Sequence, residues 1–171
     1  MEYVVAVVGA TGVVGREVVN ILETRRFPAR ELRLLATPRS AGKRVDGHRV
    51  EALREEALVG CDIAIFDVPD EVAREWVPKA TAHGAVAIDN SAAFRLDPQV
   101  PLVIPEINGR RVLDRPQNIV ANPNCTTATL LLPLAPLHRA FGLMRVVACS
   151  YQSVSGAVSY THLTLPTNRE V

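Results

Sequence analysis

The sequence has little net charge, few cysteines and no long apolar run, and each of these absences excludes a class of protein. The formal net charge is +1, so no basic surface is expected for a nucleic acid or an anionic membrane. The apolar runs are too short to span a bilayer, and the N-terminus lacks a signal-peptide pattern. The three cysteines, Cys61, Cys125 and Cys149, lack C-x-x-C spacing, and no histidine pair is spaced for a metal. A reduced, cytoplasmic setting without a metal site is therefore predicted.

The sequence does contain an alternation of strand-like and helix-like segments. Its 171 residues are 48% hydrophobic and 22% charged, as in an ordinary globular protein of one domain, or one domain plus part of another. Residues 71–83 indicate a crossover helix, with Trp76 in the core rather than in a ligand site. The alternation predicts an α/β protein with a doubly wound, Rossmann-type parallel sheet. The runs that indicate buried strands are residues 3–8, 32–36, 61–66 and 86–89.

A glycine-rich turn follows the first strand-like run directly. Gly9, Gly12 and Gly15 are spaced G-x-x-G-x-x-G, and apolar residues then recur at helical spacing. Gly9 and Gly12 would let the backbone turn tightly beside a pyrophosphate at the helix N-terminus, and Gly15 would allow close helix–strand packing. Glycines also serve plain tight turns, but the strand–turn–helix context favours dinucleotide binding.

The loop after the second strand bears on the choice of cofactor. An NAD-binding protein usually has an acidic residue there for the ribose 2′-hydroxyl, and this chain has none. Thr37, Arg39 and Ser40, with Lys43 as a further candidate, offer hydroxyl and cationic donors that suit a 2′-phosphate. NADP is therefore preferred over NAD, the alternative being a solvated basic loop.

Cys125 lies in the segment Asn122–Thr127, between a strand-like run at 118–121 and a helix-like run at 128–137. Backbone N–H groups and the helix dipole at such a turn favour the thiolate, which makes Cys125 a candidate nucleophile. The alternative is a buried cysteine that serves as a small apolar residue.

Other polar segments are expected at the same edge of the sheet, because parallel strands end there together. Arg95 closes the segment Asp89–Arg95 and could clamp a phosphate or carboxylate, or be an ordinary surface arginine. Pro105–Gly109 indicates a turn-rich loop, and residues 145–153 a strand. Residues 45–53 around Asp46-Gly47 predict a hairpin at the sheet edge.

Taken in this order, the motifs resemble those of aspartate-semialdehyde dehydrogenase. The resemblance covers about residues 3–157 and is most specific at Asn122–Thr127 and Tyr151–Ala157. It implies an NADP-dependent reductive dephosphorylation of 4-aspartyl phosphate to aspartate 4-semialdehyde and inorganic phosphate, a step toward lysine, threonine and methionine. It also implies a homo-oligomer for the family.

The resemblance implies a role for individual residues. Cys125 is similar to the nucleophile that forms a thioacyl intermediate, and Gln152 to the residue that orients it. Asn124 would shape the site, and Arg95 would bind phosphate. The residues that match the family's cofactor contacts are Gly9, Thr11, Gly12, Val13, Thr37, Arg39 and Ser40, with Ser91 and Gly156 as additions.

The chain departs from the family in two places. Asp67-Val68-Pro69 stands where many relatives have Ser-Ala-Gly, so the nicotinamide-side contact differs. Residues 158–171 are unlike the family, and its later acid, arginine and histidine have no counterpart, so His162 is not assigned their role. We therefore expect an NADP-binding domain at 1–124, the start of an incomplete α+β catalytic and dimerisation domain at 125–157, and a non-family tail. Little or no turnover is expected of these 171 residues alone.

Two alternative functions remain open at this point. N-acetyl-glutamyl-phosphate reductase shares the fold and the cysteine chemistry, but Asn124 and the loop 37–43 favour the aspartyl enzyme. The chain could also be a non-catalytic nucleotide-binding module, in which case Cys125→Ser would leave NADP binding unchanged.

Overall fold

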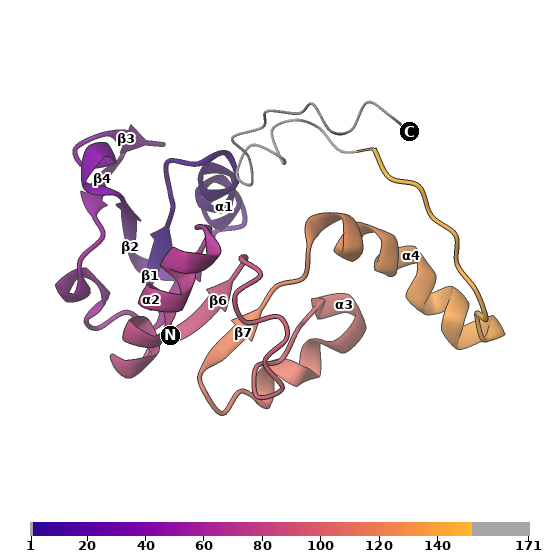
Figure 1. Ribbon diagram of the computed structural model, residues 1–171. Helices are drawn as coiled ribbons and strands as arrows, with labels where there is room; N and C mark the ends of the chain where they lie inside the picture. The colour runs from indigo at the N-terminus through magenta and orange to yellow at the C-terminus, as the bar shows by residue number, and fades with distance from the viewer. Residues whose placement is uncertain (1, 152–171) are drawn as a thin grey trace, which may run out of the picture.

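The computed structural model describes residues 2–151, which form a mostly parallel sheet with one long helix extending from it (Figure 1). The strands are β1 (Tyr3–Val8), β2 (Ala29–Ala36), β3 (Arg44–Val45), β4 (His48–Ala52), β5 (Ile63–Phe66), β6 (Val86–Asp89) and β7 (Ile119–Ala121). The α-helices are α1 (Val13–Thr24), α2 (Asp70–Ala82), the short α3 (Pro105–Asn108) and α4 (Cys125–Phe141). Short 3₁₀ turns occupy Pro38–Ser40, Glu55–Leu58 and Gly109–Leu113.

The strand order is that of a doubly wound sheet. In the described residues it runs β3-β4-β2-β1-β5-β6-β7, and the pairings are parallel except for the β3–β4 hairpin. The chain leaves β1 toward β2 and β4, and then crosses back to β5 on the other side of β1. The strand order therefore reverses between β1 and β5, where ligands of such sheets bind. The predicted Rossmann-type fold is confirmed.

The two long helices next to the sheet cover its opposite faces. Successive side chains of a strand point to opposite faces, and those of β1 divide accordingly between two apolar clusters. Val7 packs in a cluster with Val19 of α1, whereas Val8 packs in a cluster with Val77 of α2. Trp76 is half-buried against the second cluster, so its predicted place in the core is confirmed.

The hairpin expected around Asp46-Gly47 is present at the edge of the sheet. Val45 pairs with His48 in the antiparallel β3–β4 ladder. Asp46 and Gly47 have φ angles of 48° and 85°, the positive values that a tight two-residue hairpin turn requires. The β4 strand then pairs in parallel with β2, which joins the hairpin to the sheet.

The interpretation of Pro105–Gly109 as a turn-rich loop is wrong, because the chain is helical there. Proline at the first position of α3 suits a helix start, where its missing N–H costs nothing. Asn108 stabilises the segment from its end, since its side chain accepts from the Ile104 N–H and donates to the Leu102 carbonyl, each at 2.8 Å.

The strand predicted at residues 145–153 is also wrong over its described part. Residues 145–151 are extended but unpaired with any strand, and they are exposed. A strand needs a neighbour to accept its backbone hydrogen bonds, and none of the described strands pairs with this segment. Residues 152 and 153 lie outside the described residues.

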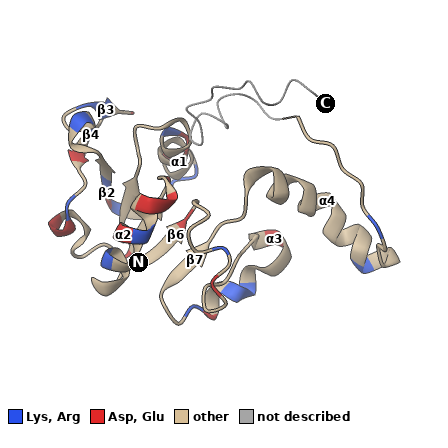
Figure 2. Ribbon diagram, viewed as in Figure 1, with Lys and Arg blue, Asp and Glu red and all other residues tan. Residues whose placement is uncertain are grey.

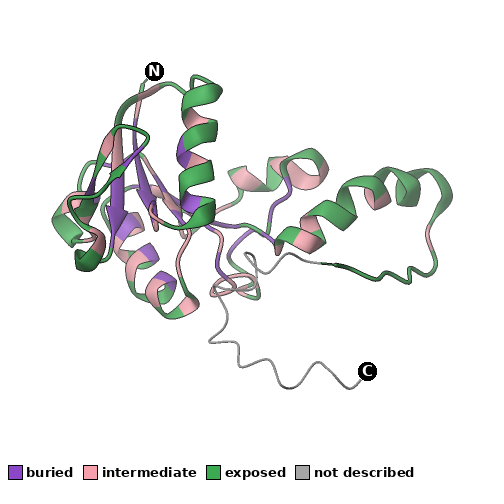
Figure 3. Cartoon of the chain, turned by 90° about the horizontal axis from the view of Figure 1, so that it is seen from above, coloured by how far each residue is buried: buried purple, intermediate pink, exposed green. Residues whose placement is uncertain are grey.

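Helix α4 is longer than the predicted segment 128–137 and packs differently from the other long helices. It has no buried residue although most of its side chains are apolar, and Figure 3 shows it exposed or half-buried along its whole length, in contrast to the strands. Pro133 and Pro136 lie inside it. None of the helices in residues 2–151 combines the length and apolar character needed to cross a membrane.

Candidate active site

The glycine turn between β1 and α1 leaves no room for a side chain at Gly9 or at Gly15. Gly9 has a φ of 92°, and a Cβ there would lie 2.0 Å from the backbone oxygen of Asp67. A Cβ on Gly15 would lie 2.3 Å from the Gly9 oxygen, so α1 begins in direct contact with the turn. The Gly12 N–H donates to the Gly9 carbonyl at 2.9 Å. The tight turn and the close packing expected of this motif are both present.

The start of α1 is exposed beside this turn. Gly12 is the N-cap of α1 and is exposed. The next residue, Val13, is 73% exposed. Backbone N–H groups at the start of a helix have no partner within the helix, and together with the helix dipole they attract an anion. A Cβ at Gly9 would collide with the backbone of Asp67 and a Cβ at Gly15 with that of Gly9, so this shape depends on both glycines.

Asp67 places a carboxyl group beside the same helix start. It follows β5 directly and is half-buried, with Oδ2 3.7 Å from where a Cβ of Gly12 would lie. Burial raises the pKa of Asp67 above its ordinary value, and hydrogen bonds from the Asn90 side chain and from the Gly15 backbone N–H partly offset this. An acidic group thus lies next to the exposed start of α1.

The loop that is predicted to distinguish NADP from NAD follows β2, the strand next to β1. The N–H of Gly9 donates to the Leu35 carbonyl of β2 at 2.8 Å, which brings the end of β2 alongside the glycine turn. Thr37 and Arg39 are exposed and Ser40 is half-buried in the 3₁₀ turn that follows β2. These donors therefore follow the end of β2 that contacts the glycine turn.

Cys125 is the first residue of α4 and is exposed. The strand β7 ends at Ala121, so the predicted strand-to-helix turn is confirmed, and the alternative of a buried cysteine is excluded. Asn124 is the N-cap: its Oδ1 accepts from the Thr126 N–H at 3.0 Å and from the Thr127 N–H at 3.4 Å. This cap fixes the start of the helix and therefore the position of Cys125.

Arg95 ties together the loops that follow β6 and β7. Its Nε donates to the Asn122 carbonyl at 2.9 Å, and its Nη2 donates to the Asn90 carbonyl at 2.8 Å. The two asparagines also meet directly, because Asn122 Nδ2 donates to Asn90 Oδ1 at 3.0 Å. In this arrangement Arg95 binds two backbone carbonyls, and it lies close to the turn that carries Cys125.

Ser91 is buried and is engaged with Asp89 at the end of β6. Its hydroxyl donates to Asp89 Oδ2 at 2.7 Å and its N–H to Oδ1 at 3.1 Å. Burial raises the pKa of the Asp89 carboxyl, and the hydrogen bonds from Ser91 together with the charge of Arg95 act in the opposite direction. The Ser91 hydroxyl thus supports the turn after β6. Gln152 and Gly156, which were predicted as site residues, lie outside the described residues.

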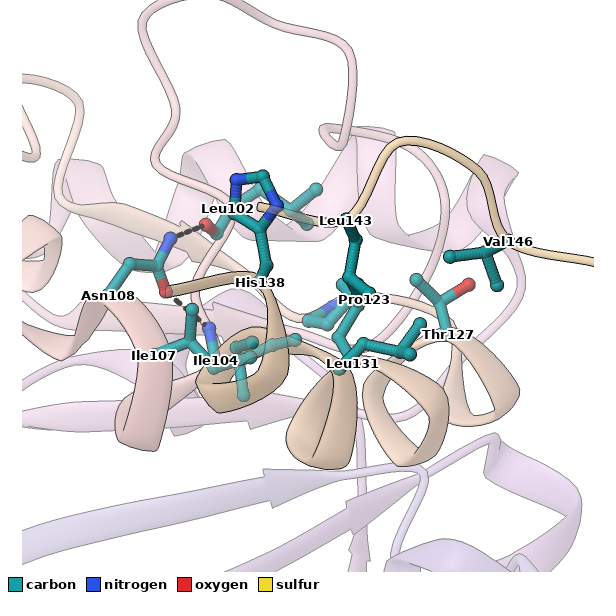
Figure 4. A pocket seen from close by; sticks show the side chains of 12 residues that line it. Leu102, Ile104, Ile107, Asn108, Pro123, Thr127, Leu131, His138, Leu143 and Val146 are labelled. Atoms are coloured by element: carbon teal, nitrogen blue, oxygen red, sulfur yellow. Dashed lines mark hydrogen bonds between the residues drawn. The ribbon is translucent and has the colours of Figure 1, made fainter. Parts of the chain in front are cut away.

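An apolar groove of about 470 Å³ lies between α3 and α4 (Figure 4). Side chains such as Ile107 and Leu131 line it, together with Asn108 and His138. The glycine turn does not line this groove, but Pro123 and Thr127, which lie two residues before and after Cys125, do. Figure 2 shows that charged residues lie over the sheet and its helices, whereas α4 is almost free of charge.

Asn90 and Asn122 were not predicted as individual site residues, and Asp67 was predicted only as a departure from the family. All three follow directly after a parallel strand, namely β6, β7 and β5. That position was the available signal, because residues just beyond parallel strands meet at one edge. No cluster of three or more potential metal ligands occurs among the described residues.

The fold and the site together define a class of protein. It is a dinucleotide-binding α/β protein whose glycine turn follows β1, beside the point where the strand order reverses. A cysteine stands at the start of the helix that follows β7. Residues 4–115 match the family described as "Semialdehyde dehydrogenase, NAD binding domain", and the chain belongs to this family.

Several known proteins are similar to the chain over most of its length. It is 47% identical to the aspartate-semialdehyde dehydrogenase of Aquifex aeolicus, over 92% of this chain and 48% of the relative. The crystal structure of aspartate semialdehyde dehydrogenase II from Vibrio cholerae, complexed with ASA, is similar with a TM-score of 0.79 and 41% identity, over 83% of this chain and 48% of that one. The Candida albicans enzyme with NADP has a TM-score of 0.64 and 25% identity, over 84% and 48%. The chain thus spans about half the length of the relatives it matches.

Proposed function

We propose that this chain carries the cofactor-binding part and the nucleophile of an NADP-dependent aspartate-semialdehyde dehydrogenase. The reaction would be the reductive dephosphorylation of 4-aspartyl phosphate to aspartate 4-semialdehyde and inorganic phosphate, in the cytoplasm. The observation that carries the proposal is the placement of Cys125 at the same sheet edge as the glycine cradle. The relatives named above, all aspartate-semialdehyde dehydrogenases, support this substrate over N-acetyl-glutamyl phosphate.

The chain's own residues would hold the dinucleotide in an extended pose across the strand ends. The start of α1, with Gly9, Thr11, Gly12 and Val13, would receive the pyrophosphate. Thr37, Arg39 and Ser40 would receive the 2′-phosphate, because Arg39 can donate a charge-assisted, bidentate pair of hydrogen bonds. When bound, the nicotinamide supplies a hydride.

Cys125 would act as the nucleophile. Its thiolate attacks the carbonyl carbon of the acyl phosphate, a C–S bond forms, and the C–O bond to phosphate breaks as phosphate leaves with the electron pair. After reduction the C–S bond breaks and the thiolate is restored, which divides one difficult step into easier ones. The N-cap of Asn124 keeps the attacking sulfur at the helix start. We further assign phosphate binding to Arg95 and orientation of the intermediate to Gln152.

We propose that the 171 residues alone turn over little. They span about half of the relatives' length, and residues 125–157 would be the beginning of a catalytic and dimerisation domain that follows the cofactor domain at 1–124. We therefore expect NADP binding and thiol reactivity from this chain, with homo-oligomeric, full-rate catalysis only in a chain of the relatives' length. Phosphate-dependent reduction of NADP by aspartate semialdehyde at the relatives' rates would contradict this.

The cofactor preference is tested by measuring dissociation constants for NADP and NAD with Arg39→Gln. The loss of a charge-assisted pair to the 2′-phosphate is expected to weaken NADP binding by roughly tenfold and to leave NAD binding unchanged. Arg49→Gln is the matched control, because Arg49 is an exposed arginine on the neighbouring β4 strand. Equal effects of both changes on NADP would show that Arg39 contributes only general charge.

The nucleophile is tested by alkylation of Cys125, followed by peptide mass spectrometry. At neutral pH we expect Cys125 to react faster than Cys149, which is also exposed but lies in an extended segment. Bound NADP should change the rate at Cys125 and leave Cys149 unaffected. If the two cysteines react alike with and without NADP, the chain is better described as a non-catalytic nucleotide-binding module.

A further inference from the structure

The loops that follow β6 and β7 hold the Arg95 guanidinium between them, and their contacts give Asn122 a role that rests on the function proposed above. We propose that Asn122 is a positioning residue for phosphate binding, because it fixes the direction in which Arg95 presents its remaining N–H groups. Arg95 meets the phosphate in this proposal, whereas Asn122 acts only through Arg95.

One edge of the Arg95 guanidinium is bound by two backbone carbonyls. Nε donates to the Asn122 carbonyl at 2.9 Å, and Nη2 donates to the Asn90 carbonyl at 2.8 Å. Because the guanidinium is planar and rigid, two hydrogen bonds to different loops restrict both its place and the orientation of its plane. They use only two of its five N–H groups, and Nη1 makes no hydrogen bond within residues 2–151. The Nη1 side of the guanidinium is therefore the side that an anion would meet.

The two carbonyls differ in how firmly their own peptide units are held. The peptide unit that carries the Asn90 carbonyl also carries the Ser91 N–H, which donates to the carboxyl of the buried Asp89 at 3.1 Å. The peptide unit that carries the Asn122 carbonyl ends in Pro123, and proline has no N–H. No N–H of its own peptide unit anchors the Asn122 carbonyl, so its orientation depends on other contacts.

The side chain of Asn122 supplies such a contact. Its Nδ2 donates to Asn90 Oδ1 at 3.0 Å, so the side chains join the same two residues whose carbonyls hold Arg95. The Asn122 N–H donates to the Asp89 carbonyl at 2.8 Å, which ties residue 122 to the end of β6 but does not orient its carbonyl. Loss of the side-chain bond should therefore let the Asn122 carbonyl turn away from Nε and release one of the two contacts of the guanidinium.

A guanidinium held in this way serves the departure of phosphate in the proposed reaction. Asn122 lies three residues before Cys125, a reach of at most about 11 Å along the chain, so Arg95 and the thiol lie at the same edge of the sheet. The phosphate leaves with the electron pair of the broken C–O bond, and a charge-assisted hydrogen bond from Arg95 stabilises it. A donor that is already oriented loses less conformational freedom when the anion binds.

The test measures how strongly an anion is favoured at Cys125 in the whole chain of 171 residues. Cys125 is alkylated at low ionic strength with iodoacetate, which is anionic, and with iodoacetamide, which is neutral, and peptide mass spectrometry gives both rates. The ratio of the two rates reports the charge near the thiol, because changes in thiol pKa or exposure affect both reagents alike. Inorganic phosphate at constant ionic strength should lower this ratio by competing for Arg95. A ratio that phosphate leaves unchanged would contradict phosphate binding at Arg95.

The variants separate the charge of Arg95 from its positioning. Arg95→Gln removes the charge and should lower the ratio by roughly twofold, the effect of one charge about 10 Å away in water. Asn122→Ala keeps the charge but should lower the ratio toward that of Arg95→Gln and weaken the effect of phosphate. Asn20→Ala is the matched control, because the side chain of the exposed Asn20 also donates a hydrogen bond, to Glu17, but on α1. It should leave the ratio and the phosphate effect as in the unaltered chain.

A second variant keeps the proposal testable if Asn122→Ala fails to fold. Asn90→Ala removes the same side-chain bond from the other loop, so it should lower the ratio as Asn122→Ala does, and the double variant should lower it no further. If Arg95→Gln lowers the ratio and Asn122→Ala changes only the melting temperature, Asn122 is a structural residue and the proposal is wrong. If Arg95→Gln also leaves the ratio unchanged, the phosphate role of Arg95 in the proposed function fails as well, so the two failures are distinguishable.

Discussion

Both the sheet and helix α4 are rich in apolar residues, but the sheet buries them and α4 leaves them exposed or half-buried. Strand β1 buries five of its six residues completely or nearly so, and its side chains pack against a helix on each face. Helix α4 has no buried residue, and Leu130, Leu132 and Leu137 are each at least 40% exposed. Its two internal prolines also remove backbone hydrogen bonds. The sheet is thus stabilised by its own core, whereas α4 has little support among the described residues.

The candidate site lies on the boundary between the sheet and α4. The glycine cradle belongs to the well-packed sheet, but Cys125 is the first residue of α4. Cofactor binding should therefore depend on the rigid part of the molecule. The geometry around the thiol should instead depend on the short segment Asn122–Asn124 and on the helix cap, because packing along α4 contributes little.

The largest expected difference between the regions concerns side chains that fill the core. Phe66 is completely buried at the end of β5, so Phe66→Ala should lower the free energy of unfolding by about 4 kcal/mol. Leu132 on α4 is 43% exposed, and Leu132→Ala should change it by no more than about 0.5 kcal/mol. Urea unfolding measures both. Similar losses in the two variants would show that α4 belongs to the same cooperative unit as the sheet.

A smaller difference is expected for two glycines that share a left-handed backbone. A Cβ on Gly9 would meet a backbone oxygen at 2.0 Å, whereas a Cβ on Gly142, just after α4, would meet nothing within 4 Å. Gly9→Ala should therefore cost about 3 kcal/mol, from strain and from forced displacement of the turn. Gly142→Ala should cost at most about 1 kcal/mol, from its φ of 66° alone, and less than this in global unfolding because α4 contributes little to the core. Equal losses in urea unfolding would contradict the close contact at Gly9.

The sequence was sufficient to predict the sheet because the strands are local and their patterns are strong. Continuous apolar runs, such as Tyr3–Val8, indicated buried parallel strands, and the Asp46-Gly47 pair indicated the hairpin. These signals depend on few residues each, and the structure confirms them. The extended segment at 145–151 was predicted wrongly for the opposite reason. Its apolar pattern suits a strand, but a strand exists only where another segment pairs with it, and this pairing is not a local property.

The candidate site was predictable only in its outline. Cys125 at a strand-to-helix turn and the tight packing of Gly15 followed from residue type and spacing, and both are present. The hydrogen bonds among Arg95, Asn90 and Asn122 were not predicted, because they join the loops after β6 and β7, which are far apart in the sequence. Ser91 shows a different limit: its hydroxyl is engaged with the buried Asp89 two residues earlier, a contact that depends on the geometry of the turn and not on residue type alone.

The smallest expected effect concerns the cap that joins the two regions. Asn124→Ala removes the side-chain oxygen that accepts from the Thr126 and Thr127 N–H groups, and the loss of such a cap costs about 1 kcal/mol. Because α4 contributes little to the core, global urea unfolding should change less than the local opening of α4, which hydrogen exchange of its first amides measures. Cys125 alkylation should also lose any acceleration that the ordered helix start provides.

Asn124→Ser is the matched control, since a serine hydroxyl also caps helices well. It should restore amide protection at the start of α4 and the reactivity of Cys125 toward those of the unaltered chain. If serine and alanine behave alike in both measurements, the cap geometry does not govern the thiol. The stability of the cysteine turn would then have to come from Arg95 and Asn122 on the sheet side of the boundary, which would make Cys125 a part of the well-packed region rather than of α4.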